Sequence, residues 1–264
     1  MSTTLPETIP LQRGILYGPV LSRRLGRSLG LNILPDEVKV CSMNCRYCQY
    51  SWTGMLAIQP ALFAAFLPSR EAVRRALEEE LKRLAGAGTP PDTLTFSGNG
   101  EATLHPEFPA IAGDVAALRD TYAPACRTAI LSNSTTVHRP SIRAALGLLD
   151  DPILKLDTAR EATFRSLNGP AKGVTLAEVA DGLRAMDGNL VLQALFVTGS
   201  VDNSTDDEVA DWIRLTTDIH PRSVQIYTLD RGPADRGLAP VPEGRLRAIA
   251  AALRSAGLDA YAFI

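Results

Sequence analysis

Three cysteines, Cys41, Cys45 and Cys48, lie within eight residues in the order C-S-M-N-C-R-Y-C. Cysteine thiolates are the usual protein ligands of iron–sulfur clusters. Three thiolates on one short loop can hold three corners of a four-iron cluster and leave one iron without a protein ligand. Because an open iron can coordinate a substrate or a cofactor, this spacing indicates chemistry and not only a structural metal site.

Other uses of clustered cysteines fit this spacing less well. Structural zinc normally takes four ligands from paired C-x2-C units, and the sequence has no second pair. A zinc ion with three protein ligands stays open as an alternative, as does a non-catalytic iron–sulfur or zinc protein that senses redox state or binds a partner. Disulfide frameworks spread their cysteines along a chain. The remaining cysteine, Cys126, is expected to be a small buried apolar residue.

A second candidate group is the run Ser97-Gly98-Asn99-Gly100-Glu101, which follows a short apolar stretch downstream of the cysteines. Glycines let the backbone approach a ligand closely. A carboxylate accepts hydrogen bonds from an ammonium group. The run is therefore suited to hold the head of an amino acid, although a plain turn at a strand end would also explain it.

Alternating apolar runs and amphipathic stretches position these residues. Strands are predicted at 29–34, 93–97, 127–132, 153–157, 190–197, 223–229 and 260–263, and helices at 70–84, 106–119, 140–149, 176–186, 206–218 and 243–256. Ser69 is the predicted cap of the first helix, whose apolar positions are Val73, Leu77, Leu81 and Leu84. Strands separated by helices need right-handed crossovers, so the sheet should be parallel. Six such units suit a doubly wound sheet or a partial barrel, and both collect ligands at the carboxyl ends of the strands.

Polar side chains lie at or near the carboxyl ends of the later strands. They are Ser132, Asn133, Lys155, Asp157, Gln193 and Tyr227. Each can also be a helix cap or a solvated loop residue. Upstream, the basic residues Arg23, Arg24 and Arg27 can contact an anionic substrate or phosphate, or form salt bridges across the mouth of a barrel.

The apolar segment Ser51–Pro68 has neither a helical nor a strand pattern. It is expected to be a loop packed against the side of the sheet, with a lid over the active site or a partner surface as the alternative.

The composition bounds the class of protein. A chain of 264 residues with 45% hydrophobic residues can form one large domain with a sizeable core. A net charge of −2 provides no global basic field for nucleic acid or anionic lipid. The longest apolar stretch, Leu56–Leu67, is too short to cross a bilayer, and the N-terminus lacks the pattern of a signal peptide. We therefore expect a cytoplasmic protein with no membrane partner.

The cysteine motif, with Tyr47 before the last cysteine, resembles the C-x3-C-x-aromatic-C signature of the radical S-adenosylmethionine (SAM) enzymes. The resemblance implies an α/β fold, a partial parallel (β/α)6 barrel, as a single domain over residues 1–264. Residues 1–28 would be an N-terminal extension and residues 51–69 an apolar insertion near the cysteine loop. It also implies a [4Fe-4S] cluster on Cys41, Cys45 and Cys48, with SAM bound at the open iron through its amino and carboxylate groups.

The resemblance assigns roles to further residues. Gly98-Asn99-Gly100-Glu101 is similar to the G-G-E motif that holds the SAM amino group, with Asn99 in place of the first glycine. Tyr47 would lie near the adenine, and the polar residues at the strand ends would contact SAM. The implied cofactor-binding set is Tyr47, Gly98, Asn99, Gly100, Glu101, Ser132, Asn133, Lys155, Asp157, Gln193 and Tyr227.

A narrower resemblance rests on the runs 18–32, 96–106 and 224–233. These look like the radical SAM group that contains wybutosine-synthesis enzymes and many unassigned bacterial iron–sulfur oxidoreductases. Wybutosine enzymes hold a second cluster with additional N-terminal cysteines, and residues 1–40 contain no cysteine.

The activity implied is reductive cleavage of SAM to a 5′-deoxyadenosyl radical, which abstracts hydrogen from a small-molecule substrate. Modification of a tRNA nucleoside or a peptide, and chemistry of a 3-amino-3-carboxypropyl radical, stay open, with nucleic acid not favoured. The class of reaction, oxidoreductase, transferase or lyase, also stays open. A flavodoxin or a ferredoxin-type protein would supply the electron.

Overall fold

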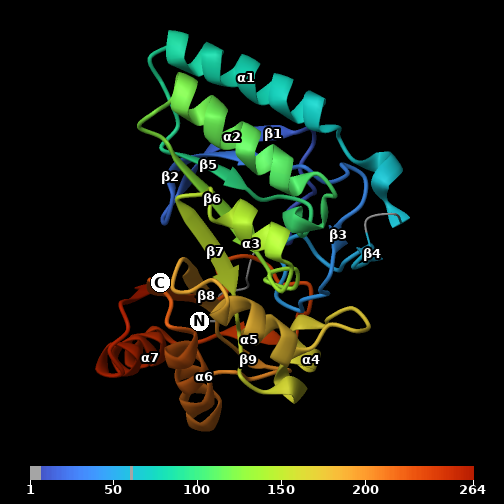
Figure 1. Cartoon of the computed structure of the whole chain (residues 1–264). Coiled ribbons are helices and arrows are strands. Elements are labelled where there is room, and N and C mark those ends of the chain that lie inside the picture. The colour runs from blue at the N-terminus through green and yellow to red at the C-terminus, as the bar shows by residue number, and fades with distance from the viewer. Residues whose placement is uncertain (1–6, 60–61) are drawn as a thin grey trace.

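The computed structural model describes residues 7–59 and 62–264. Its main sheet has eight strands in the order β1-β2-β5-β6-β7-β8-β10-β12 (Figure 1). Every neighbouring pair from β2 to β12 is parallel, and only β1 runs antiparallel to β2. Because the strands follow one another in chain order without a reversal, the sheet is a partial barrel and not a doubly wound sheet.

The strands of this sheet are β1 Leu16–Ser22, β2 Gly26–Leu31, β5 Thr93–Phe96, β6 Arg127–Ser132, β7 Asp151–Lys155, β8 Val191–Leu195, β10 Ser223–Tyr227 and β12 Ala260–Phe263. The helices are α1 Arg70–Gly86, α2 Phe108–Tyr122, α3 Pro140–Leu146, α4 Glu161–Asn168, α5 Leu176–Arg184, α6 Asp206–Ile219 and α7 Glu243–Ser255. Two small pairs, β3 Val40–Cys41 with β4 Met55–Leu56 and β9 Val197–Gly199 with β11 Leu238–Pro240, complete the strands of the described ranges. Short 3-10 helices occupy Ala64–Phe66 and Ala102–Leu104.

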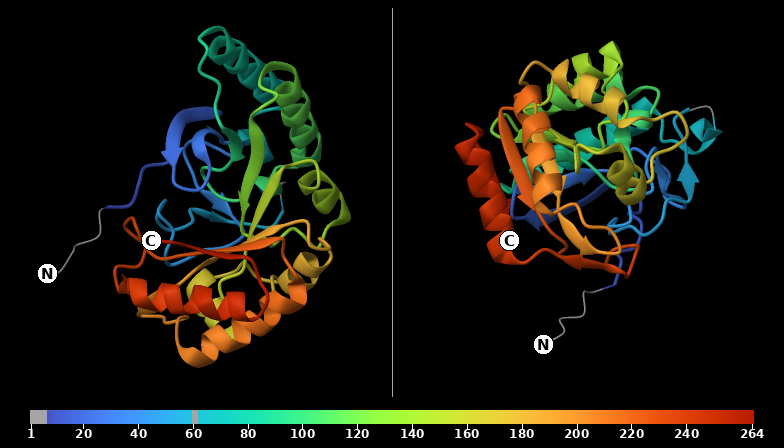
Figure 2. Two further views of the ribbon diagram at one scale, coloured as in Figure 1. Left: turned by 90° about the vertical axis from the view of Figure 1, so that its left-hand side faces the viewer. Right: turned by 90° about the horizontal axis from the view of Figure 1, so that it is seen from below.

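The predicted succession of strands and helices is confirmed. Helices cover the outer side of the curved sheet (Figure 2). In α1, the Ser69 hydroxyl accepts a hydrogen bond from the Ala72 amide at 3.2 Å, as predicted for a cap. The helix buries its apolar stripe at the predicted positions Val73, Leu77, Leu81 and Leu84. Within the described ranges, no helix combines the length and apolar character needed to cross a bilayer.

The short strands β3, β4, β9 and β11 were not predicted, and neither were two larger elements. The first is β1, which belongs to the stretch interpreted as an extension and pairs with β2 in a hairpin whose register shifts between Tyr17 and Val20. The second is α4, which has eight residues and lies between β7 and α5. Both are too short or irregular to show a clear period in the sequence.

The apolar segment Ser51–Pro68 contains β4, and its residues 60 and 61 lie outside the described ranges. Phe63 is buried and packs with Val40, Ala57 and Leu104. Trp52 and Phe66 are exposed, so the segment is only partly covered by the rest of the chain.

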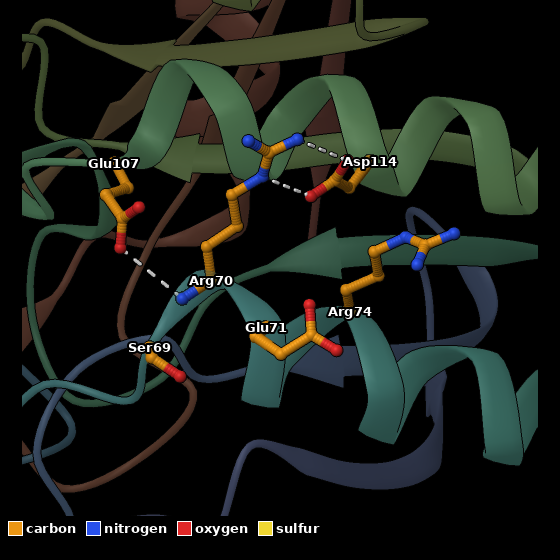
Figure 3. A pocket seen from close by; sticks show the side chains of 6 residues that line it. All are labelled: Ser69, Arg70, Glu71, Arg74, Glu107 and Asp114. Atoms are coloured by element: carbon orange, nitrogen blue, oxygen red, sulfur yellow. Dashed lines mark hydrogen bonds and ion pairs between the residues drawn. The ribbon is translucent and has the colours of Figure 1, made fainter.

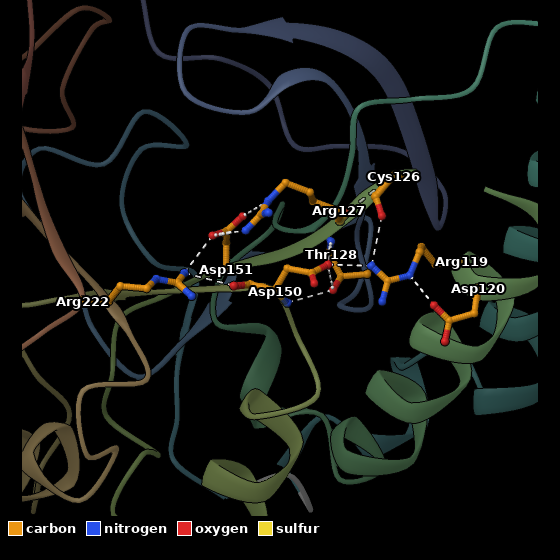
Figure 4. Close-up of polar contacts among 8 residues, drawn as sticks. All are labelled: Arg119, Asp120, Cys126, Arg127, Thr128, Asp150, Asp151 and Arg222. Atoms are coloured by element: carbon orange, nitrogen blue, oxygen red, sulfur yellow. Dashed lines mark hydrogen bonds and ion pairs between the residues drawn. The ribbon is translucent and has the colours of Figure 1, made fainter. Parts of the chain in front are cut away.

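Ion pairs join the amino ends of β6 and β7, the opposite ends of these strands from Ser132 and Lys155 (Figure 4). Arg127 and Arg222 both pair with Asp151, at 2.7 Å and 2.9 Å. Cys126 precedes β6 at this end and is buried, as expected for a small apolar residue. Such partly exposed pairs each contribute little to the free energy of unfolding. Their charged groups bind one another, so we assign them to the fold and not to a site for chemistry.

A shallow hollow lies between the first turns of α1 and α2 (Figure 3). The guanidinium of Arg70 binds both oxygens of Asp114 there, at 2.6 Å and 2.8 Å. All of its lining side chains are polar or charged. The hollow is therefore a solvated surface between two helices.

His105 makes the free energy of unfolding depend on pH. The ring is 2% exposed, its Nδ1 accepts from the Glu107 amide at 3.1 Å and its Nε2 donates to the Pro68 carbonyl at 2.9 Å. Burial holds the pKa of His105 below its ordinary value of 6.5. The unfolded chain therefore binds the proton first, and the free energy of unfolding falls as pH drops below 6.5, by up to about 1.4 kcal/mol per pH unit.

We predict that His105→Gln flattens this dependence. Urea unfolding at pH 7.5 and 5.5 measures the change in free energy. His138→Gln, the same substitution at an exposed histidine, is measured alongside for comparison. An unchanged slope in His105→Gln would contradict the assignment.

Candidate functional site

One cavity of about 640 Å³ opens at the carboxyl ends of the strands. It is lined by most of the residues predicted from the sequence, namely Cys41, Cys45, Tyr47, Cys48, Gly98, Gly100, Glu101, Ser132, Asn133, Lys155, Gln193 and Tyr227. Asn99 and Asp157 are the two predicted residues that do not line it. Parallel strands thus bring residues from distant parts of the chain to one edge of the sheet.

Backbone hydrogen bonds hold the cysteine loop in place. The amides of Asn44 and Arg46 donate to the carbonyls of Asn168 and Leu167, both at 2.9 Å. On the other side, the amide of Ala57 donates to the Cys41 carbonyl at 2.9 Å. These backbone bonds fix the main chain of the loop that carries the cysteines.

Two amide side chains donate to the cysteine sulfurs. Asn133 Nδ2 lies 3.3 Å from Cys41 Sγ, and Asn168 Nδ2 lies 3.6 Å from Cys45 Sγ. Burial raises the pKa of the Cys41 thiol to about 12 and that of the Cys45 thiol to about 11. Desolvation therefore keeps both groups as neutral thiols unless a cationic partner such as a metal centre binds them.

The set of donors indicates what this centre can be. In residues 7–59 and 62–264, no three His, Cys, Asp or Glu side chains converge closely enough to hold a single metal ion. The three thiols of one loop nevertheless line the same cavity, and Cys126 does not. Three thiols on one loop are the type and number of ligands with which a four-iron cluster can be held at three of its irons.

Glu101 contributes a buried carboxylate to the cavity. Its Oε1 accepts from the Thr103 amide at 3.2 Å, the Thr103 hydroxyl at 2.6 Å and the Ser132 hydroxyl at 2.9 Å. Among residues 7–59 and 62–264, its Oε2 accepts only from the Asn133 amide, at 2.6 Å. Burial raises the pKa of Glu101, although these hydrogen bonds oppose the shift. Oε2 therefore keeps the capacity to accept another donor from a ligand.

The turn before Glu101 is bonded to the cysteine strand. Gly98 and Gly100 have φ angles of +127° and +136°. The amide of Glu101 donates to the Val40 carbonyl at 3.0 Å, and the Val40 amide donates to the Asn99 carbonyl at 2.9 Å. The turn and the cysteine loop therefore share one backbone connection immediately before Cys41.

Asn99 turns its side chain away from the cavity. Its Oδ1 accepts from the Gln12 amide at 2.8 Å, while its Nδ2 donates to the carbonyls of Gln12 at 2.9 Å and Pro35 at 2.8 Å. The side chain is fully buried. Asn99 thus connects the motif to the N-terminal segment, which explains why a larger residue can replace a glycine at this position.

A buried network surrounds Asp157. Its Oδ2 accepts from the Tyr47 hydroxyl at 2.5 Å, and its Oδ1 lies 3.2 Å from the Lys155 ammonium and 2.8 Å from the Leu195 amide. Burial, followed by the charge of Asp157, raises the pKa of Tyr47 well above its usual value. Burial alone would lower the pKa of Lys155, but Asp157 and Tyr227 outweigh it and raise the pKa. Asp157 thus fixes the ring of Tyr47 and the ammonium of Lys155, although it does not itself reach the cavity.

Gln193 and Tyr227 come from neighbouring strands. Gln193 Nε2 donates to Gln225 Oε1 at 3.3 Å, and the Tyr227 hydroxyl accepts from Lys155 Nζ at 3.0 Å. The structure therefore brings both predicted residues to the cavity, on the side of β8 and β10.

Two asparagines that were not predicted from the sequence support the site. Asn168 donates to Asp157 Oδ2 at 2.7 Å, in addition to its contact with Cys45. Asn203 donates to the carbonyls of Asp157 and Leu195, both at 2.8 Å. The sequence Asn168-Gly169-Pro170 signals a turn, but nothing in it indicates that the side chain reaches the cysteine loop.

No protein-family model matches the chain. Over 230 residues it is 30% identical to a UPF0026 protein of Methanocaldococcus jannaschii, and the match covers 86% of this chain and 67% of that protein.

Three solved structures are similar in fold. A radical SAM methyltransferase from Sphaerobacter thermophilus has a TM-score of 0.64 and 14% identity, over 89% of this chain and 65% of that one. Streptococcus suis SuiB bound to S-adenosylmethionine has a TM-score of 0.61 and 13% identity, over 89% and 50%. Archaeal TYW1, of wybutosine synthesis, has a TM-score of 0.51 and 12% identity, over 87% and 72%. The chain thus spans less than two thirds of the first two structures, and at these identities the similarity is one of fold.

Proposed function

The chain belongs to the UPF0026 family and has the fold of radical SAM enzymes, and from this premise we propose that it is a radical SAM enzyme acting on a small-molecule substrate. One observation carries the proposal. A single cavity is lined by three thiols of one loop and by a buried carboxylate that can accept a further hydrogen bond. Such a site can hold a cluster with an open iron next to an amino-acid head group.

Cys41, Cys45 and Cys48 would hold a [4Fe-4S] cluster, whose reduced form supplies the electron that cleaves SAM into methionine and a 5′-deoxyadenosyl radical. The amides of Asn133 and Asn168 donate hydrogen bonds to the ligand sulfurs. Hydrogen bonds to ligand sulfurs stabilise the thiolate form and tune the reduction potential.

Tyr47, Lys155 and Asp157 would orient the bound nucleoside. The Lys155 ammonium lies 4.8 Å from the centre of the Tyr47 ring, which packs in a buried apolar cluster with Leu167 and Leu195. Bound SAM and substrate would displace water from the cavity and limit access of stray hydrogen donors, so the radical would abstract hydrogen from the substrate in the same cavity.

Anaerobic reconstitution with iron and sulfide tests the proposal. We expect about one four-iron cluster per chain, a change in its electron paramagnetic resonance spectrum on addition of SAM, and 5′-deoxyadenosine after reduction with dithionite. Metal binding without SAM binding would favour the non-catalytic alternative. Release of 5′-methylthioadenosine would instead indicate the 3-amino-3-carboxypropyl radical.

We also propose a reduced flavodoxin or a ferredoxin-type protein as the electron donor, by analogy of fold. Replacing dithionite with either protein and its reductase should support formation of 5′-deoxyadenosine. Failure of both donors, with dithionite active, would reject this partner.

Glu101→Gln should weaken SAM binding roughly 10- to 100-fold, because a hydrogen bond to a charged group contributes about 1.5–3 kcal/mol. The variant removes the negative charge that would face the SAM ammonium. Titration calorimetry of the cluster-loaded protein measures the Kd.

Ser132→Ala is the matched control for this substitution. It removes one donor to Oε1 and leaves the carboxylate charged, so the loss of affinity should be smaller. Equal affinities in Glu101→Gln and the unmodified protein would contradict the role of Glu101.

A further inference from the structure

We propose that Arg24 binds the anionic group, a carboxylate or a phosphate, of the small-molecule substrate. This inference rests on the proposed function, because it assigns the substrate part of the same cavity. It concerns the side of the cavity formed by the β1–β2 hairpin, β10 and β12, which the cysteine loop and Glu101 do not occupy.

The charges around the cavity favour an anion. Its charged lining residues comprise five cations and two anions, namely Arg23, Arg24, Lys39, Lys155 and Arg231 against Glu101 and Asp230. The chain as a whole has a net charge of −2, so this excess of positive charge is local. A cavity lined by one sign of charge concentrates ligands of the opposite sign.

Arg24 differs from the other four cations because its guanidinium has no hydrogen-bond acceptor among the residues that the structure describes. The others are engaged by the protein, Arg23 by Asp230 at 2.7 Å, Lys39 by the Ser51 carbonyl at 2.7 Å, Lys155 by Asp157 at 3.2 Å and Arg231 by Gln49 at 3.1 Å. Nη1 of Arg24 is buried, and no described residue accepts a hydrogen bond from it. A buried donor without an acceptor is costly, and a bound anion would supply the missing partner.

Two aromatic rings hold the guanidinium in place. It lies 4.7 Å from the centre of the Tyr227 ring and 5.8 Å from that of Phe263. Ring contacts orient an arginine without neutralising its charge. The planar fork of arginine then matches the two oxygens of a carboxylate or a phosphate.

The hairpin tip that carries Arg24 is fixed to the opposite edge of the sheet. Arg23 Nη2 pairs with Asp230 at 2.7 Å, and Arg23 Nη1 donates to the Ile264 carbonyl at 2.7 Å. Within the tip, the Ser22 hydroxyl accepts from the Arg24 amide at 3.3 Å. The sequence allowed these arginines either a salt bridge across the mouth of the barrel or contact with an anion. Arg23 forms the salt bridge, and Arg24 stays available for a ligand.

Contacts between side chains connect Arg24 to the cysteine loop. Tyr227 contacts Arg24 through its ring and Lys155 through its hydroxyl, and Lys155 lies over the ring of Tyr47. A molecule anchored at Arg24 would therefore share the cavity with the proposed cofactors, with its other end directed towards them.

The test uses the full-length, cluster-loaded protein saturated with SAM and titrated with inorganic phosphate or acetate at constant ionic strength. Titration calorimetry measures the Kd of each probe. We expect Arg24→Gln to raise the Kd for phosphate or acetate at least about tenfold, because it removes a charge-assisted contact. Arg24→Lys, which keeps the charge but not the planar fork, should be intermediate.

Arg27→Gln is the matched control, since Arg27 belongs to the same hairpin but does not line the cavity. It should bind the probes like the unmodified protein. The relative affinities for phosphate and acetate identify the anionic group. Thermal unfolding of each variant separates loss of binding from loss of structure.

The proposal is overturned if neither probe binds, if Arg24→Gln and Arg24→Lys bind them like the unmodified protein, or if SAM displaces the probe. The last result would place Arg24 in the cofactor site. The titration is repeated without SAM. An anion site at Arg24 would persist in a protein that does not cleave SAM, so this measurement distinguishes failure of the anion-site proposal from failure of the proposed function.

Discussion

Cys45→Ala should lose cluster binding and SAM cleavage together, with 5′-deoxyadenosine falling to the level of the cluster-free protein. Two thiolates from the loop, Cys41 and Cys48, would not suffice to hold a four-iron cluster that already lacks one protein ligand. Iron and sulfide analysis after reconstitution measures the cluster, and chromatography of the reaction measures the nucleoside.

Cys126→Ala is the control for this loss. Cys126 is buried at the amino end of β6 and takes no part in the cavity, so the variant should bind a full cluster and cleave SAM at the unmodified rate. SAM cleavage retained by Cys45→Ala, or lost in Cys126→Ala, would reject the assignment of the ligands.

Gly100→Ala should have the second-largest effect, on stability and on SAM binding together. A Cβ atom at Gly100 would lie 1.7 Å from the Val40 carbonyl oxygen and 2.5 Å from its carbon, at a φ of +136°. The obstacle is backbone, which cannot rotate away as a side chain can. The turn would have to separate from the cysteine strand, at a cost of roughly 3–5 kcal/mol, the range of the largest single-residue effects.

Gly113→Ala provides the matched comparison. This glycine lies within α2, and nothing would meet its Cβ within 4 Å. Alanine should therefore stabilise the helix by about 0.5–1 kcal/mol. Denaturant unfolding measures both variants, and unmodified stability in Gly100→Ala would show that the turn is not held as described.

Local patterns predicted the regular part of the fold. The apolar stripe of α1 and its cap Ser69 need only neighbouring residues, so both could be predicted from the sequence. The β1–β2 hairpin could not, because its register shifts around Gly18-Pro19 and its tip is fixed by the distant Asp230. The strand and helix patterns also did not distinguish a partial barrel from a doubly wound sheet. The two differ in strand order, which depends on packing between elements and not on the pattern within each element.

In the site, too, some features follow from local patterns and general rules, whereas others depend on contacts between distant residues. Glu101 and the cysteines meet because parallel strands end at one edge, a rule that needs no side-chain detail. The prediction that the whole motif faces the ligand was wrong for Asn99. The positive φ angles at Gly98 and Gly100 turn the backbone on either side of it, and its side chain points away from the cavity. Asn168 reaches Cys45 across 123 positions of the chain, and such a contact leaves no local trace in a single sequence.

The backbone hydrogen bonds of the cysteine loop have a consequence for a protein that is exposed to air. If oxygen destroyed the proposed cluster, Asn44 and Arg46 would still be bonded to the last residues of α4, and Cys41 would still be bonded to Ala57. The emptied loop would keep its shape. Recovery would then require a fresh supply of iron, sulfide and reductant, with no need for a chaperone or for new synthesis of the polypeptide.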